Sequence, residues 1–376
     1  MSIYLDYQAT TPLDPAILDA MRPYWERDFG NPHSSHRHGW QASAALDLAR
    51  KSVTQIVGTK PDWCIFTSGA TEANNLALKG VMQAAPLERN RLITIATEHS
   101  CVLESARWLE GQRFALTILP VDREGLIDLQ DLEDALGPDV ALVSVMAINN
   151  EIGVRQPLAE IGKRARAAGA LFHTDAAQAF GKIFLDAEAM SIDLLSISGH
   201  KIYGPKAIGA LLVRPGTAIA PQMHGGGQEG EGLRSGTLAP ALIAGLRAAA
   251  EIAADRMEEN AAHAETLWTL MRDRLPPHIV NGSIRHRWKG NLNIAFEDID
   301  GTRLLADLRR VSLSSGAACA SAAGRQSHVL EAIGLAPKLA AASLRMGWGR
   351  GTTEDEIVAV ADMIGEAIAN QRRMAA

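Results

Sequence analysis

The sequence has few cysteines, no low-complexity tract and no long apolar run. Its 376 residues include three cysteines, too few for a disulfide framework, and nothing about them indicates secretion. The first residues, MSIYLDYQATTP, lack the basic and apolar regions of a signal peptide. Apolar stretches such as 140–149 and 238–246 fall far short of the roughly 20 residues that span a bilayer. We therefore expect a cytoplasmic protein that does not enter a membrane.

The charge balance is mildly acidic. There are 37 Lys and Arg residues against 43 Asp and Glu, which gives a formal net charge of −6 and argues against a dedicated nucleic-acid binder. Hydrophobic residues make up 47% of the chain and charged residues 21%, as in ordinary globular proteins. At about 150 residues per domain, the length favours two or three domains.

Short apolar runs alternate with helical stretches between residues 60 and 214. Most of these runs are continuously apolar, as expected for strands buried on both faces. The alternation predicts a largely parallel sheet with crossover helices, and ligands bind such sheets at the carboxyl ends of the strands. The expected strands are 63–67, 91–96, 114–119, 140–147, 170–174, 194–198 and 208–213, and the helices between them include 71–82, 128–136 and 158–168.

The pattern changes after Pro240. Residues 241–275 predict one or two long helices, which Pro276 and Pro277 would end. Strands at 279–281 and 291–295, a helix at 301–310, a polar loop of small residues and a last helix at 355–371 are expected to follow. We interpret this last third as a second, smaller domain.

Lys201 and Asp175 each follow an apolar strand. Lys201 ends the segment Ser-Ile-Ser-Gly-His-Lys, and its amine can act as a nucleophile if burial or nearby cations lower its pKa. Asp175, in Phe-His-Thr-Asp, is suited to pair with a protonated ring nitrogen, as in pyridoxal phosphate (PLP) enzymes. A solvated turn lysine and a helix-capping aspartate remain the structural alternatives.

A third motif, Phe66-Thr-Ser-Gly-Ala-Thr71-Glu, predicts a strand, a turn of small residues and the start of a helix. Free backbone N–H groups and the helix dipole at such a start bind phosphate, although a purely structural cap remains possible. It is not a Walker A loop, because no Gly-Lys-Ser/Thr follows. The three motifs together supply a phosphate cradle, a ring-nitrogen partner and a lysine for a Schiff base.

These motifs resemble those of class V PLP enzymes of the aminotransferase fold, and most closely the cysteine desulfurases. The segments that carry the resemblance are Tyr4-Leu-Asp-Tyr-Gln-Ala-Thr-Thr-Pro12, Thr67-Ser-Gly-Ala-Thr-Glu72, Asn149-Asn-Glu-Ile-Gly153, Ser198-Gly-His-Lys-Ile-Tyr-Gly-Pro205 and Arg234-Ser-Gly-Thr237. The resemblance implies an α/β protein of fold type I. Its large domain, residues 13–255, would hold a mostly parallel seven-stranded sheet, and residues 1–12 with 256–376 would form a smaller α+β domain.

Cys319 lies in the segment Ser314-Ser-Gly-Ala-Ala-Cys-Ala-Ser-Ala-Ala-Gly-Arg325. A thiol among small residues in a loop is expected to be accessible, while a lone cysteine is more commonly a small buried residue. Group I desulfurases carry their sulfur-accepting cysteine in a loop of this kind, so the resemblance implies that Cys319 carries a persulfide. Cys64, in an apolar run, is expected in the core, and Cys101 is expected near the site without a chemical role.

The resemblance also assigns the remaining roles. Lys201 would hold PLP covalently, His99 would stack on the ring and act as an acid or base, Asp175 would pair with the ring nitrogen and Gln178 would bond the phenolic oxygen. Ala70, Thr71, Ser198 and His200 would bind the phosphate, and Thr237 would reach the phosphate of the neighbouring subunit in a homodimer unless it only caps a helix. Asn150 and Arg345 would hold the substrate carboxylate, whereas Arg345 taken alone would suggest a surface salt bridge.

The expected partners are L-cysteine, a second copy of the chain, and an iron–sulfur scaffold or another sulfur acceptor. The last predicted helix ends close to Ala376, where housekeeping desulfurases usually continue, so the acceptor stays open between nitrogen-fixation and other pathways. A class V enzyme with another substrate, such as selenocysteine, and an inactive assembly scaffold are the alternatives. His33, His36 and His38 have no carboxylate or thiolate at ligand spacing, so no metal site is expected.

Overall fold

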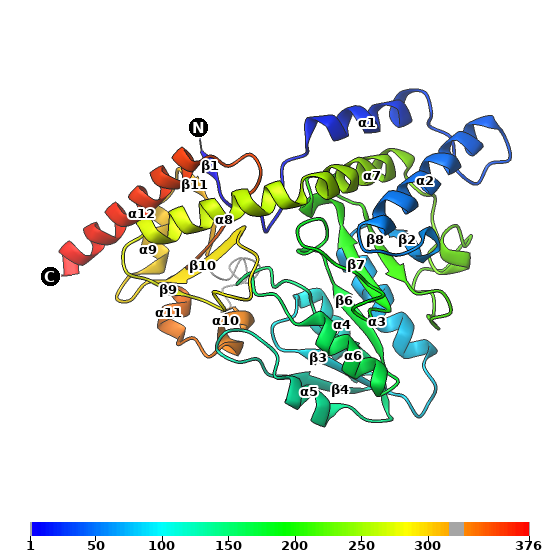
Figure 1. The fold of residues 1–376 in the computed structure, drawn as a ribbon, viewed down its shortest axis with the longest axis horizontal. Coiled ribbons are helices and arrows are strands. Elements are labelled where there is room, and N and C mark those ends of the chain that lie inside the picture. The colour runs from blue at the N-terminus through cyan, green and yellow to red at the C-terminus, as the bar shows by residue number, and fades with distance from the viewer. Residues whose placement is uncertain (1, 316–326, 376) are drawn as a thin grey trace.

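The computed structural model describes residues 2–315 and 327–375. Its main feature is a seven-stranded sheet with the order β2-β8-β7-β6-β5-β3-β4 (Figure 1). Strand β8 runs opposite to the other six strands, which share one direction, so the sheet is mostly parallel. The strands are β2 (Cys64–Thr67), β3 (Arg91–Ile95), β4 (Ala115–Leu119), β5 (Val140–Ser144), β6 (Leu171–Asp175), β7 (Leu194–Ser198) and β8 (Gly209–Val213). The seven expected strands are confirmed, with ends shifted by at most three residues.

Helices cover both faces of this sheet. One face packs against α3 (Ala70–Ala84) and α4 (Ser100–Glu110). The other packs against α1 (Pro15–Glu26), α2 (Arg37–Gln55), α5 (Leu129–Ala135), α6 (Leu158–Ala167) and α7 (Pro240–Asp255). Burial on two sides is the physical reason why apolar residues predominate in these strands.

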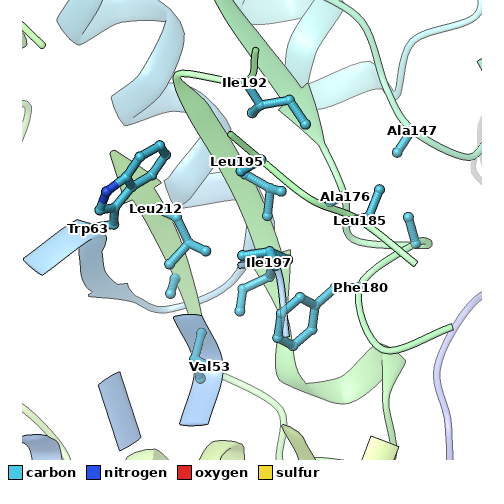
Figure 2. Close-up of a cluster of buried hydrophobic side chains, with 14 of the residues drawn as sticks. Val53, Trp63, Ala147, Ala176, Phe180, Leu185, Ile192, Leu195, Ile197 and Leu212 are labelled. Atoms are coloured by element: carbon cyan, nitrogen blue, oxygen red, sulfur yellow. The ribbon is translucent and has the colours of Figure 1, made fainter. Parts of the chain in front are cut away.

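Neighbouring residues of a strand contribute to different core clusters. Leu195 and Ile197 of β7 and Leu212 of β8 lie in the cluster with α2 and α7, which Figure 2 shows. Leu194 and Leu211, one position away, pack against α3 and α4. Successive side chains of a strand point to opposite faces, so both faces need apolar residues here.

A second sheet lies in the C-terminal part of the chain and is antiparallel throughout, with the order β12-β13-β10-β9. Its strands are β9 (Ile279–Val280), β10 (Asn291–Ala295), β12 (Ser314–Ser315) and β13 (Ser343–Gly347). Leu292, Ile294, Leu344 and Met346 pack against α8 (Met257–Arg274) and α12 (Glu354–Ala375). The alternate residues, which include Arg345, therefore face the other side of this sheet.

The N-terminal segment joins the C-terminal part of the chain. Strand β1 (Ile3–Tyr4) pairs in parallel with β11 (Val311–Ser312), and Leu5 belongs to the core cluster of α8 and α12. Figure 1 shows β1 beside β11, close to α12. The chain then crosses to the large sheet, where Thr11 bonds the backbone of His200. Residues 6–10 thus pass between the two sheets.

Some boundaries differ from the sequence-based expectation. The helix expected at 301–310 is α9 (Gly301–Asp307), because the following residues turn into β11. Residues 241–275 form two helices, α7 and α8, that join at Arg256. The remaining elements are the short helices α10 (His328–Ala332) and α11 (Pro337–Ala341) and the 3-10 turns η1 (Pro61–Trp63), η2 (Gly199–Lys201) and η3 (Gly230–Gly232). No helix within 2–315 or 327–375 is long and apolar enough to cross a membrane.

Candidate active site

A cavity of about 590 Å³ lies where the carboxyl ends of the large sheet meet the second sheet. Residues that follow β2, β3, β5, β6 and β7 line one side, as expected for a parallel sheet. The other side is lined by residues 6–10, here called the N-terminal crossing, and by the second sheet. They contribute Asp6, Gln8, Ala9 and Thr10, and Ser314 and Arg345. The predicted site residues in its wall are Ala70, Thr71, His99, Asn150, Asp175, Gln178, Ser198, His200, Lys201 and Arg345.

Lys201 ends a single 3-10 turn that begins directly after β7. Its Nζ donates to the backbone carbonyls of Gln8 and Ala9, at 2.9 Å for Ala9. These two carbonyls belong to the N-terminal crossing, so a segment almost 200 residues away positions the amine. The sequence motif located the lysine but gave no sign of these partners.

Asp175 is the last residue of β6 and is nearly buried, at 5% exposure. Its Oδ1 accepts from the backbone N–H of Ala177 at 2.9 Å, and its Oδ2 accepts from Asn74 Nδ2 at 2.7 Å. Asn74 belongs to α3 and is fully buried. These bonds fix the orientation of the carboxylate at the cavity wall, where it can pair with a cationic ring nitrogen.

His99 is the N-cap of α4 and also lies in the cavity wall. Its Nδ1 accepts from the backbone N–H of Cys101 at 3.2 Å and lies 3.0 Å from Cys101 Sγ. Because Nδ1 is the acceptor, the neutral ring carries its proton on Nε2. Burial is the main cause that lowers the pKa of His99; the Lys201 charge lowers it further and Asp175 opposes both.

The start of α3 forms an anion cradle. The first N–H groups of an α-helix have no acceptor within the helix, and its dipole favours negative charge there. Gly69 precedes the helix with φ +147°, a conformation that a residue with a side chain rarely adopts. Ser198, whose hydroxyl lies next to Gly69, lines the same cavity together with His200 and Lys206. Burial, then the charge of Lys201, lowers the pKa of His200 to about 4, which makes it a neutral ligand.

Arg345 projects into the cavity from β13 and is only 2% exposed. Its Nη2 donates to Asp6 Oδ1 at 2.7 Å and to Ser314 Oγ at 3.1 Å, and its Nη1 donates to the carbonyl of Asn150 at 3.3 Å. The surface salt bridge suggested for an isolated arginine is therefore wrong, because this ion pair is largely buried. The sequence did not identify Asp6, although it lies within the Tyr-Leu-Asp-Tyr segment.

Two predicted residues are not found in the described cavity wall, one because of its position and one because it is not described. Thr237 is exposed and is not part of the cavity wall. The capping alternative for Thr237 is wrong, since α7 begins at Pro240 with Ala239 as its N-cap and no side-chain cap. Cys319 lies outside the described residues.

The other two cysteines lie where they were expected. Cys64 is buried in β2, and burial raises the pKa of its thiol strongly. Cys101 lines the cavity and bonds Asn74, and burial followed by the charge of Asp175 raises its pKa to about 12. Both therefore stay protonated at neutral pH.

Comparison with known proteins identifies the family. Residues 3–360 match the family described as Aminotransferase class-V. A human protein named "Cysteine desulfurase" is 50% identical over 362 residues, which is 94% of this chain and 79% of the human one. A solved "NIFS-LIKE PROTEIN" superposes with a TM-score of 0.92 at 33% identity, covering 98% of this chain and all of that one.

A second solved structure, titled "SspA in complex with cysteine", has a TM-score of 0.83 and 36% identity and covers 92% of this chain and 98% of its own. The match extends over almost the whole chain and includes both sheets that build the cavity. The chain is therefore an enzyme of the class-V aminotransferase family and belongs to its cysteine desulfurases.

Proposed function

We propose that the protein is a PLP-dependent desulfurase of the group I type, which converts L-cysteine to L-alanine and transfers the sulfur to Cys319 as a persulfide. The observation that carries this proposal is the meeting of Lys201, Asp175, the anion cradle of α3 and Arg345 in one cavity. A second class V substrate such as selenocysteine would use the same residues, so the product assay below includes it.

The groups in the cavity wall fit PLP. The start of α3 with Ser198 and His200 would hold its phosphate, Asp175 would pair with its ring nitrogen, and Lys201 would hold it covalently. His99 would lie against the ring and Gln178 would donate to the phenolic oxygen. When bound, PLP supplies an electron sink that stabilises negative charge on the substrate Cα.

The chain's own residues move protons and bind substrate. Arg345 and Asn150 orient the substrate carboxylate, and the Lys201 amine takes the proton from Cα. The Cys319 thiolate attacks the substrate sulfur: the new S–S bond forms as the Cβ–S bond breaks, and the electron pair stays with carbon. Cβ then takes up a proton and becomes a methyl group, and the Lys201 amine returns a proton to Cα, which completes alanine. His99 accepts or returns a proton near the substrate.

Chain length permits Cys319 to take this role. Ser314 lines the cavity and Cys319 follows five residues later. At roughly 3.3–3.6 Å per residue, five residues reach up to about 17 Å. The raised pKa of Cys64 and of Cys101 leaves both as poor nucleophiles at neutral pH, which favours Cys319 further.

We expect Arg345→Gln to raise KM for L-cysteine by about 30- to 100-fold with a smaller loss of kcat. The variant removes a charged hydrogen-bond donor, which contributes about 2–3 kcal/mol when it binds a carboxylate. Steady-state kinetics with L-cysteine measure this split. Arg274→Gln, which removes an exposed arginine paired with Asp362 on α12, is the control and should leave KM unchanged. A large fall in kcat at constant KM would remove Arg345 from substrate binding.

Activity should persist into mildly acidic solution before it falls. His99 has a pKa below its ordinary value of 6.5, because burial disfavours its charged form. If neutral His99 is the required base, kcat stays constant as the pH falls to about 6.5 and decreases only below it. A pH profile of kcat, compared between wild type and His99→Gln, tests this. A kcat that already falls near pH 8 in the wild type, but not in His99→Gln, would contradict this prediction.

We further propose a homodimer that works in the cytoplasm. Thr237 is exposed in one chain, as required if it reaches the phosphate in the neighbouring subunit. Exposed apolar side chains on and between α1 and α2 support a protein contact there; they are Leu18, Trp25, Phe29, Trp40 and Leu48. Sedimentation at twice the mass of one chain would support the dimer, and a monomer with full activity would contradict it.

Strand pairing and shared core residues support the proposed domain boundaries. Residues 1–12 are placed with 256–376 because β1 pairs with β11 and Leu5 shares a core with α8 and α12. Residues 13–255 contain the large sheet and its helices, ending with α7. The sulfur would pass from Cys319 to an iron–sulfur scaffold or another acceptor protein.

The function is tested by incubating the PLP-loaded protein with L-cysteine and dithiothreitol. We expect alanine and sulfide in equal amounts. Incubation with L-selenocysteine tests the alternative substrate. Pyruvate and ammonia in place of alanine, or no product from either amino acid, would overturn the proposal.

A further inference from the structure

Lys182 lies behind the cavity wall, in the turn that follows β6. It lines a second, smaller cavity of about 30 Å³, which shares Gln8 and Lys201 with the main cavity. Tyr7, Tyr203 and Arg350 line the same space. None of the motifs discussed above gives Lys182 a role.

The amine of Lys182 donates to Oε1 of Gln178 at 3.0 Å. On the other end of that amide, Gln178 Nε2 donates to the backbone carbonyl of Gln8 at 2.9 Å. The charged lysine amine offers only N–H donors to this amide, and the carbonyl of Gln8 offers only an acceptor, so both contacts favour the same orientation of the amide. The Gln178 side chain is thereby fixed, and the second hydrogen on Nε2 is left for a ligand in the main cavity.

The surroundings of Lys182 contain other cations and no carboxylate partner. Lys182 takes part in none of the ion pairs found among the described residues. Burial, and then the charge of Lys201, lowers its pKa to about 7, and its own charge contributes to the lowered pKa of His200. An amine donates hydrogen bonds in both its charged and its neutral form, so the contact with Gln178 persists on either side of neutral pH.

We propose that Lys182 is a positioning residue for the coenzyme: it holds the Gln178 amide so that its N–H donates to the phenolic oxygen of PLP. The inference rests on the proposed function and adds to it a residue that does not touch the coenzyme. If the amide were reversed, Gln178 Oε1 would face the carbonyl oxygen of Gln8 and the phenolic oxygen of PLP. Both hydrogen bonds would then be replaced by repulsion between oxygens. Lys182 therefore supports the charge on the phenolic oxygen through Gln178.

The test uses three holoenzyme variants. Lys182→Met removes the donor and keeps the apolar stem, Lys182→Gln keeps an N–H donor without the charge, and Lys163→Met removes an exposed lysine on α6 as the control. Two quantities are measured: the Kd for PLP, and the pH midpoint of the visible band of the bound coenzyme. Donation to the phenolic oxygen stabilises the deprotonated chromophore, so its loss should raise the midpoint.

For Lys182→Met we expect a Kd about fivefold higher and a midpoint about 0.7 pH units higher, the size of one lost hydrogen bond. Lys182→Gln should restore the Kd to within about twofold and the midpoint to within about 0.3 pH units of the wild-type values, and Lys163→Met should change neither. In a Gln178→Leu background, Lys182→Met should have no further effect on the midpoint, because the amide is absent.

Either of two results would overturn the inference. One is an unchanged midpoint in Lys182→Met. If only Tm falls in that variant, Lys182 stabilises the fold and does not position the Gln178 amide. The other is the same shift with and without Gln178, which would show that Lys182 acts directly by its charge. A wild-type protein that takes up no PLP would instead overturn the proposed function itself, so the two failures are distinguishable.

Discussion

Replacing Cys319 by serine lowers the formation of alanine and sulfide from L-cysteine by at least about a thousandfold, because a serine hydroxyl cannot form the S–S bond that removes the sulfur. The visible band of bound PLP and its Kd remain unchanged, because Cys319 is not among the groups proposed to hold the coenzyme, most of which lie in the described cavity wall. Alanine formation and the absorbance spectrum of the same sample measure both effects.

The matched control for this variant is Cys64→Ala. Cys64 is buried in β2 and the raised pKa of its thiol keeps it protonated, so its loss should leave turnover near the wild-type value. Undiminished alanine formation by Cys319→Ser would remove Cys319 from the reaction. A variant that also loses its colour would point to a structural role.

The second large effect is expected for Lys201→Ala. The variant should lose its visible band on dialysis, and turnover should fall by at least about ten-thousandfold, since one amine both holds the coenzyme and takes the Cα proton. Absorbance before and after dialysis, followed by a turnover assay with added PLP, measures the two losses separately.

Lys60→Ala, at an exposed lysine before η1, controls for the loss of a positive charge and should behave as wild type. The result that would contradict the assignment is a Lys201→Ala protein that stays coloured after dialysis and still forms alanine. Recovery of the wild-type rate by added PLP alone would likewise show that the amine is not needed for proton transfer.

The large sheet was predictable because its strands are chemically distinct from their surroundings. Leu194–Ser198 and Gly209–Val213 are fully buried, so the second appears in the sequence as an unbroken apolar run and the first is interrupted only by small serines. Strand β13 was missed for the opposite reason. In Ser343–Gly347 only Leu344 and Met346 face the core, and the arginine between them faces the cavity, which leaves too short an alternation to indicate a strand.

The strand-end residues of the cavity were also predictable. Lys201, Asp175 and His99 each follow a strand of the large sheet, and the carboxyl ends of parallel strands meet at one edge. No such rule applies to Asp6 and Gln8. They enter the cavity because β1 pairs with β11 at the opposite end of the chain, a contact that no local pattern indicates.

Partners of a single side chain were the hardest to foresee. Asn74 lies on the inner face of α3, where a polar residue looks unfavourable until Asp175 is seen to accept its hydrogen bond. The position of Lys182 is likewise explained by its partner, because its amine donates to Gln178 Oε1. Such contacts depend on how elements pack, and the sequence contains only the anomaly of a polar residue in a core position.

The most direct test of the whole account is the mass of the peptide that contains Cys319, taken after a single turnover with L-cysteine and trapping of free thiols. We expect a gain of one sulfur atom on Cys319, in an amount equal to the alanine formed, and no gain on Cys64 or Cys101. Alanine formed with an unmodified Cys319, or with the sulfur on another cysteine, would contradict it.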